Sequence, residues 1–407
     1  MNNNVQYITN VNVITKDSIL EDQCIILEDD RFKGILPMYK MAEALSDMAG
    51  GKIHDGKGAF VTAGFIDIHS DNIESVVQPR PTSIIDFEIA LVEHEKQLVN
   101  QGITTMYHSL SFLRMDGGAM RDKEARKPEK MRLLAELIKS LHERSHLIRH
   151  RFHCRYDIRN SEGYDTLMDY MEKDYINLLS FNDHTPGQGQ YRDLTKYRES
   201  LKGYKPELGD GQIDTMIGER MAVPKISREM IEKTAAVARS KGIPIASHDD
   251  DSEEKLEYVH TELRAEISEF PVELSVARKA KEKGMHTVAG APNVLMGRSH
   301  SGNLSAIEAI LDGSIDILCS DYYPPAILHA LFKLHNDYGM KLWDCFNLVT
   351  LNPAKALGMD REFGSVDEGK KADFLMIDMI NDMPFITRVF IDGKLVSELN
   401  YRLEKYA

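Results

Sequence analysis

Eight short apolar runs, separated by segments with helical patterning, constrain the fold of this chain more than any other feature. The runs lie at residues 61–68, 103–108, 148–156, 176–181, 243–247, 265–270, 285–290 and 315–320. The predicted helices between them lie at 87–100, 129–146, 226–240, 271–283, 304–311 and 325–338. Alternating strands and helices are typical of parallel βα units, and eight such units predict a closed (β/α)₈ barrel. An open doubly wound sheet is the alternative, but its glycine-rich phosphate turn is absent after the first run.

The two ends of the chain have a different pattern. Residues 1–60 contain short β-like pieces and polar turns, and residues 359–407 contain further strands with a hairpin signal at Asp392 and Gly393. Each end alone would leave an apolar face exposed, so we expect both to pack together as one small β-sandwich domain. The predicted division is 1–60 with 359–407 for the sandwich and 61–358 for the barrel.

Charge and composition limit the partners of the chain. Its 407 residues include 50 basic and 64 acidic side chains, for a net charge of −14. This balance argues against nucleic acid or an anionic membrane as the main partner, but not against a phosphorylated small molecule. The four scattered cysteines form no C-x-x-C pair, and no apolar run approaches the roughly 20 residues that span a bilayer. With no signal-peptide pattern at the amino terminus, we expect a cytoplasmic protein; self-assembly into a homo-oligomer stays open.

Six of the eight predicted strands end in residues that can bind a metal ion. In a parallel barrel the carboxyl ends of all strands meet at one rim, where catalytic sites lie. A single histidine is more often structural, but a set on one rim is a stronger signal. The candidate ligands are His69, Asp71, Asp157, His184, His248, Glu269 and Asp321. They predict one or two divalent ions, with zinc as the first choice and manganese or iron as alternatives.

Charge separates these candidates from one another. Four carboxylates among them would carry −4 and offset the +4 of two divalent ions, which leaves no positive charge for an anionic substrate. We therefore expect at least one of the four carboxylates not to bind metal, or to bind one ion only. Asp157 is a candidate bridging carboxylate, and Glu269 is the weakest ligand candidate. A divalent ion lowers the pKa of a bound water from about 16 toward roughly 7. Asp321, on the last strand, is the candidate catalytic residue that takes the remaining proton. The acids at 249–251 are expected to orient ligands or cap a helix.

The segment after the seventh strand is typical of anion binding. Backbone amides at the helix start predicted at residue 304, with polar side chains before it, can bind a phosphate; a serine-capped turn is the alternative. Arginines near other strand ends are further candidates for binding phosphate. The candidate substrate-binding residues are Arg80, Arg155, Arg192, Asn293, Arg298, Ser299, His300, Ser301 and Asn303. The long connection 185–224 is interpreted as a lid, a binding loop or a disordered segment, with a helical insertion as the alternative.

Several motifs resemble those of the amidohydrolase superfamily. They are VTAGFIDIH at 61–69, GITT at 102–105, NPAKALG at 352–358 and GSVDEGKKAD at 364–373. Within it, the chain is similar to the ribose 1-methylphosphonate 5-triphosphate diphosphatases of phosphonate breakdown. The motifs behind this closer resemblance are HSDNIE at 69–74, QPRP at 78–81, DHTPGQ at 183–188, SHDDD at 247–251, EFP at 269–271, GAPNV at 290–294 and SHSGN at 299–303.

The resemblance implies a metal-dependent hydrolase. It would cleave a phosphoanhydride of a ribose 1-alkylphosphonate 5-triphosphate and release diphosphate. Most superfamily members carry His-x-His on the first strand, where this chain has His69 and Asp71. A carboxylated lysine or a glutamate often bridges the metals, where this chain offers Asp157. Two alternatives stay open: an amidohydrolase acting on an acyl amide or cyclic amide, and a catalytically inactive relative that binds or assembles.

Overall fold

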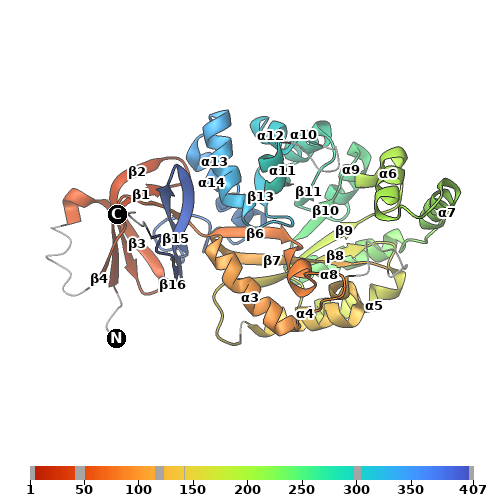
Figure 1. Cartoon of the computed structure of the whole chain (residues 1–407), viewed down its shortest axis with the longest axis horizontal. Helices are drawn as coiled ribbons and strands as arrows, with labels where there is room; N and C mark the ends of the chain where they lie inside the picture. Colours follow the sequence, from red (N-terminus) through yellow and green to blue (C-terminus); the bar gives the residue numbers. More distant parts are fainter. Residues whose placement is uncertain (1–4, 42–50, 115–122, 142, 298–303, 403–407) are drawn as a thin grey trace, which may run out of the picture.

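The larger part of the molecule is a barrel of parallel strands. The computed structural model describes residues 5–41, 51–114, 123–141, 143–297 and 304–402. The barrel strands pair in sequence order and are β6 (Phe65–Ser70), β7 (Ile103–Phe112), β8 (Arg149–Asp157), β9 (Leu178–Asn182), β10 (Ile245–His248), β11 (Ile267–Glu269), β12 (His286–Gly290) and β13 (Ile317–Cys319). A parallel bridge between Ser70 and Asp321 brings the last strand against the first. The predicted (β/α)₈ barrel is confirmed as a nearly closed eight-stranded barrel (Figure 1).

Helices cover the outside of the barrel. The longer ones are α3 (Phe87–Asn100), α4 (Pro128–Leu141), α5 (Tyr164–Glu172), α8 (Arg228–Ser240), α9 (Glu253–Thr261), α10 (Leu274–Glu282) and α13 (Ala326–Tyr338). Shorter helices are α2 (Asn72–Val77), α11 (Ala291–Met296), α12 (Ala306–Leu311), α14 (Leu342–Asn347) and α15 (Leu351–Ala356), and 3₁₀ turns lie at Met38–Lys40, Glu124–Arg126, Ser161–Gly163 and Gly189–Tyr191. α4 buries Met131, Leu134 and Ile138, the three- and four-residue spacing of a helix with one apolar face. Among the described residues, no helix has the length and apolar composition needed to cross a membrane.

The connection 185–224 is a helical insertion, which was the alternative to a loop. It contains α6 (Leu194–Tyr204) and α7 (Asp210–Met221). The two helices share a small core of their own, made by Tyr197, Leu201, Ile213 and Ile217. The insertion therefore has an ordered structure beside the carboxyl ends of β9 and β10, as Figure 1 shows.

Both ends of the chain join in a second sheet. Its strands are β1 (Val5–Ile14), β2 (Ile19–Glu28), β3 (Arg31–Pro37), β4 (Lys52–Asp55), β5 (Phe60–Ala63), β14 (Phe374–Ile380), β15 (Met383–Ile391) and β16 (Lys394–Glu398). The two halves meet where β14 pairs antiparallel with β5. Apolar side chains from both halves, such as Ile25, Val61 and Phe374, share one buried cluster. This arrangement fits the β-sandwich predicted from both ends; it lies at the left of Figure 1.

The apolar run at 61–68 was predicted as one barrel strand, and this was wrong. Its first part belongs to β5 of the small sheet and its second part to β6 of the barrel. Gly64 separates them, and a Cβ at Gly64 would collide with the side chain of Thr104 on β7. A glycine at position 64 therefore allows one continuous segment to pass from the small sheet into the barrel.

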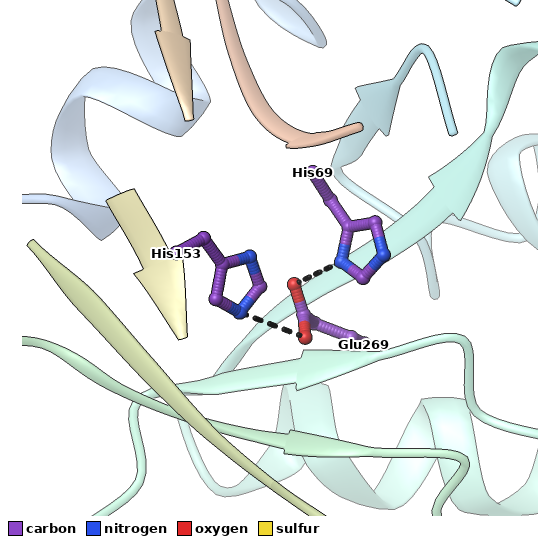
Figure 2. A group of neighbouring side chains, drawn as sticks. All are labelled: His69, His153 and Glu269. Carbon is purple, nitrogen blue, oxygen red and sulfur yellow. Dashed lines mark hydrogen bonds and ion pairs between the residues drawn. The ribbon is translucent and has the colours of Figure 1, made fainter. Parts of the chain in front are cut away.

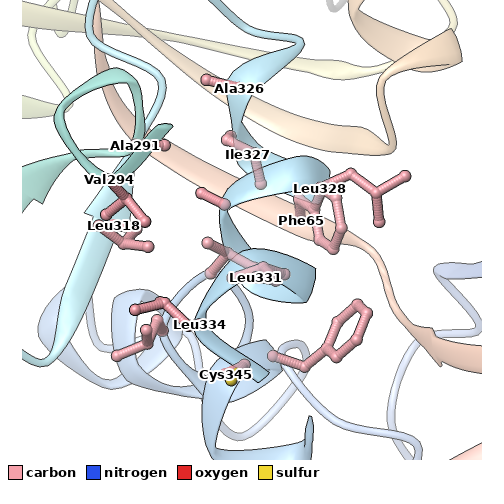
Figure 3. Packing of buried hydrophobic residues seen from close by; sticks show 14 of the residues in the cluster. Phe65, Ala291, Val294, Leu318, Ala326, Ile327, Leu328, Leu331, Leu334 and Cys345 are labelled. Carbon is pink, nitrogen blue, oxygen red and sulfur yellow. The ribbon is translucent and has the colours of Figure 1, made fainter. Parts of the chain in front are cut away.

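α13 packs against the seam where the barrel closes. Leu331 and Leu334 of this helix lie in one buried cluster with Phe65 of β6 and Leu318 of β13 (Figure 3). Burying an aliphatic side chain of this size contributes about 1.5–3 kcal/mol. The packing holds β6 and β13 side by side, and these strands lead to His69 and Asp321 at their carboxyl ends.

Candidate functional site

Side chains from several barrel strands converge on one pocket at the carboxyl ends. The pocket has a volume of about 170 Å³. The predicted metal ligands that line it are His69, Asp71, His248 and Asp321, and the predicted substrate-binding residues that line it are Arg155 and Asn293. Asp249, Phe270 and Gln190 complete much of the remaining wall. The structure thus brings six of the predicted residues from distant parts of the chain to one place.

A buried cluster of two imidazoles and a carboxylate adjoins this pocket. The ligand atoms of His69, His153 and Glu269 all lie within 4.8 Å of one another (Figure 2). Oε1 of Glu269 is 2.8 Å from Nδ1 of His69, and Oε2 is 3.6 Å from Nε2 of His153. The three side chains are 0–2% exposed. Among the described residues, Oε2 of Glu269 has no hydrogen-bond partner.

The chemistry of this triad fits a divalent metal ion. A buried carboxylate oxygen without a partner is costly, and a cation between it and two imidazoles would remove that cost. Burial, together with Arg155 and His248, keeps the pKa of His69 well below its ordinary value. Burial lowers the pKa of His153 to about 3. Both rings are therefore neutral, which a histidine must be to bind a metal.

Sequence reasoning missed His153 and ranked Glu269 last. His153 lies two residues before Arg155 and four before Asp157 on β8, so the three side chains point to the same face of the strand. That spacing was the available signal. Glu269 lies at the centre of the triad, with one oxygen directed to each histidine.

Asp321 lies at the seam where the barrel closes. Its backbone N–H donates to the carbonyl of His69 (3.0 Å), and its carbonyl accepts from the N–H of Asp71 (2.9 Å). Burial and the neighbouring Asp71 raise the pKa of Asp321 to about 7. Burial, and then Glu74, also raise the pKa of Asp71. A carboxyl group with a pKa near neutrality can both accept and release a proton.

His248 is flanked by a carboxylate and a guanidinium. Its Nδ1 lies 2.9 Å from Oδ2 of Asp249, and its Nε2 accepts from Nη2 of Arg155 at 3.2 Å. Asp249 thus has the orienting contact expected of the acids at 249–251. Helix capping in that segment is done by Ser252, whose hydroxyl accepts from the N–H of Lys255.

Asp157 and His184 lie together in a separate group of contacts. Oδ2 of Asp157 accepts from Nδ1 of His184 (3.1 Å), and both of its oxygens accept from Arg159. Burial alone would raise the pKa of Asp157, but His184 and Arg159 hold it well below its ordinary value. Neither Asp157 nor His184 is among the residues that line the pocket.

The other predicted substrate-binding residues are placed as follows. Arg80 is exposed in a turn after α2, where it pairs with Ser83. Arg192 lies in the insertion and forms an ion pair with Glu273 at 2.5 Å. The helix predicted from residue 304 begins at Ala306, with Ser305 as its cap. Arg298, Ser299, His300, Ser301 and Asn303 lie outside the described residues.

Comparison with known proteins decides the family. The model of the amidohydrolase family matches residues 60–396. The chain belongs to the amidohydrolase family. This amidohydrolase is 31% identical, over 93% of its length and 100% of the relative, to the alpha-D-ribose 1-methylphosphonate 5-triphosphate diphosphatase of Escherichia coli (strain K12). Both resemblances predicted from the motifs are thereby confirmed.

More distant relatives share the whole architecture. The amidohydrolase is 25% identical to the imidazolonepropionase of Thermoanaerobacter pseudethanolicus, over 89% of this chain and 85% of the relative. Its fold matches A. niger ochratoxinase with a TM-score of 0.66 and 12% identity, covering 98% and 96% of the two chains. It matches the 5-methylcytosine deaminase of Klebsiella pneumoniae with a TM-score of 0.64 and 16% identity, covering 98% and 99%. Members of this superfamily are metal-dependent hydrolases, and the triad offers a place for the metal.

Proposed function

We propose that this amidohydrolase cleaves a phosphoanhydride of a ribose 1-alkylphosphonate 5-triphosphate and releases diphosphate. The observation that carries the proposal is 31% identity along the full length of the Escherichia coli diphosphatase. The pocket supports it, because a buried guanidinium, Arg155, faces the same space as the candidate metal ligands. A fixed positive charge in this position suits a phosphate chain.

We propose that His69, His153 and Glu269 hold a divalent cation, with zinc as the first choice. Asp71, His248 and Asp321 lie on the pocket side of this triad. When bound, such a cation supplies Lewis-acid activation of a water molecule and of a phosphoryl oxygen. The triad supplies two neutral imidazoles and one carboxylate, a common ligand set for a catalytic zinc.

We propose that Arg155 binds the phosphoryl group that reacts. It is 9% exposed, lines the pocket, and its Nε has no hydrogen-bond partner among the described residues. Guanidinium groups bind phosphate through paired N–H donors, and removal from water strengthens such contacts. Arg155 would therefore orient the phosphate and neutralise part of its charge.

Asp321 is placed to move the proton that the reaction releases. Attack of a water oxygen on phosphorus breaks one phosphoanhydride bond, and the water proton must pass to a base. The carboxylate of Asp321 faces the pocket next to Asp71, and Gly290 opposite it leaves room for its side chain. Its pKa of about 7 suits a group that takes a proton from water and returns it to the departing diphosphate.

The size of the pocket limits how much substrate it can enclose. Typical small-molecule sites have volumes of about 300–1,000 Å³, whereas this pocket has about 170 Å³. We propose that the reacting phosphoryl end lies in it and that the ribose and phosphonate lie outside. Gln190 lines the pocket, so the insertion borders it.

An amide hydrolase is the second candidate function. The 25% identity to an imidazolonepropionase favours it, because that similarity also extends over most of both chains. Arg155 could bind a carboxylate as well as a phosphate, since guanidinium pairs with both. The pocket chemistry alone therefore admits both substrate classes.

A direct substrate comparison tests the proposal. Purified protein, supplied with zinc or manganese, is assayed for diphosphate release from ribose 1-methylphosphonate 5-triphosphate and for cleavage of acylated amino acids and cyclic amides. We expect diphosphate release that stops on chelation and returns when metal is added back. Cleavage of amides without release of diphosphate would contradict the proposal. Activity that survives chelation would argue against the metal.

A further inference from the structure

We propose that this site binds a single divalent cation, with the buried guanidiniums of Arg155 and Arg159 taking the place of a second. The inference rests on the proposed metal-dependent function and specifies its metal content. It concerns Asp157, the predicted bridging carboxylate, and His184 and His248, which are predicted ligands outside the triad. In the structure, these residues are already bound to protein groups.

Asp157 has no acceptor site left for a metal. A carboxylate has about four lone-pair positions. Oδ1 of Asp157 accepts from the backbone N–H of Arg159 (3.0 Å) and from its Nε (3.0 Å). Oδ2 accepts from Nη2 of Arg159 (2.7 Å) and from Nδ1 of His184 (3.1 Å). The carboxylate expected to bridge two metals is therefore fully engaged.

Arg159 is a permanent part of this group. Its side chain is 1% exposed and is one of the largest fully buried side chains in the protein. A guanidinium stays charged under all ordinary conditions, so it needs a carboxylate partner when it is buried. Replacing its contacts with a metal ion would leave two positive charges next to each other in a medium of low polarity.

His248 is engaged in a similar way. Its Nδ1 faces the carboxylate of Asp249, and its Nε2 accepts a hydrogen bond from Arg155. A metal ion at Nε2 would have to displace a guanidinium that is itself mostly buried. Its Nε2 is thus engaged by a guanidinium, whereas its Nδ1 lies beside a carboxylate without a hydrogen bond among the described residues.

The carboxylate at the end of β9 is also engaged. β9 ends at Asn182, whose Oδ1 accepts from the hydroxyl of Ser180 at 3.3 Å, and the next residue, Asp183, pairs with Lys225 at 2.6 Å. In the triad, Oε2 of Glu269 lacks a hydrogen-bond partner among the described residues, so this carboxylate oxygen is available to a cation. The nitrogens of His153 contact the hydroxyls of Ser109 and Ser180, which can rotate to donate or accept. Among the described residues, His69, His153 and Glu269 are the one group of at least three His, Cys, Asp or Glu side chains whose ligand atoms all lie within 4.8 Å of one another, which gives one place for a cation.

Metal content measured on the intact protein tests this inference. The full chain is equilibrated with excess zinc, freed of unbound metal, and analysed by mass spectrometry of the elements. We expect one zinc per chain. A second sample loaded with manganese should give the electron paramagnetic resonance spectrum of an isolated ion. Two equivalents, or the spectrum of a coupled manganese pair, would overturn the inference.

Two matched carboxylate-to-amide substitutions locate the ion. Glu269→Gln should reduce the metal content by about tenfold or more, whereas Asp157→Asn should leave it at one equivalent. Because Asp157→Asn removes the charge partner of Arg159 and can weaken folding, His184→Ala provides a second variant that should also keep one equivalent. A loss of metal in a folded His184→Ala protein would overturn the inference.

The inference and the proposed function can fail separately. A protein that holds two ions and still releases diphosphate would refute the single-ion inference and leave the function standing. A protein that holds one ion and releases no diphosphate would support the single-ion inference and refute the proposed function.

Discussion

Two regions of this amidohydrolase hold buried histidines next to a buried glutamate, and of the described residues in the two regions only His69, in the first, lines the pocket at the carboxyl ends of the strands. In the triad, Nδ1 of His69 lies 2.8 Å from Glu269. In the second region, which we call the wall cluster, His94 of α3, His108 of β7 and His150 of β8 lie beside Glu95. Nε2 of His108 is 2.8 Å from Nδ1 of His150, whose Nε2 is 3.2 Å from Glu95. Residue types and burial are thus alike in the two regions.

The difference lies in which face of the barrel strand each histidine occupies. His153 shares its face of β8 with Arg155, which lines the pocket. His150 lies three residues earlier and therefore on the opposite face, toward the helices. Glu95 in the wall cluster also accepts from the backbone N–H of Ile148 at 2.9 Å, which anchors the start of β8. Strand face and access to a pocket separate a reactive histidine from a structural one.

Removing a pocket-side group should have the largest effect on activity. We expect Asp321→Asn to lower kcat by at least about a hundredfold, in the range typical for loss of a proton-transfer group. We expect a similar loss for His248→Ala, because this ring lies in the pocket wall between Asp249 and Arg155. The fold, measured by circular dichroism, should be unchanged. His94→Gln in the wall cluster is the matched control and should keep kcat within about twofold, because it touches no reacting group. Near-normal turnover of either pocket variant would remove the distinction between the two regions.

Replacing the pocket arginine should affect binding more than chemistry. Arg155→Met is expected to raise KM for the triphosphate by about 10- to 100-fold, as for loss of a paired, buried phosphate contact. Steady-state kinetics of diphosphate release provide the measurement. An unchanged KM would show that the phosphate chain lies elsewhere.

Acid should weaken the fold through the wall cluster. Burial lowers the pKa of His94 to about 3 and lowers those of His108 and His150, whereas a histidine in the unfolded chain has a pKa near 6.5. The stability that these neutral histidines contribute is therefore fully present above about pH 7. It falls as the pH drops below 6.5, because only the unfolded chain takes up the protons. Each such histidine contributes up to about 1.4 kcal/mol per pH unit.

The His94→Gln variant isolates one of these contributions. Urea unfolding at pH 7.5, 6.5 and 5.5 should show a shallower loss of stability for the variant than for the natural protein, by about 1 kcal/mol per pH unit below 6.5. Identical slopes would mean that His94 does not remain neutral in the folded wall cluster.

The smallest effect is expected at the rim. Arg192 is 38% exposed and already pairs with Glu273, so Arg192→Ala should change KM by about fivefold or less, which corresponds to ~1 kcal/mol. A larger change would show that the insertion contacts substrate directly and that the substrate site extends beyond the pocket.

The sequence predicted the barrel well because periodicity and turn residues are local signals. It failed where a contact between distant residues decides the outcome. Gly64 divides one apolar run between two sheets because Thr104 of the next strand lies against it. His184, 27 positions along the chain, engages Asp157 together with Arg159, and nothing in the spacing of these residues shows that. His153 could have been found from the alternation along β8, but its contact with Glu269 required the closed barrel.

The most direct test is an anomalous diffraction map of crystals grown with zinc. The account predicts a single strong peak among the side chains of His69, His153 and Glu269. A peak in the wall cluster, or none in a protein that still hydrolyses its substrate, would contradict it.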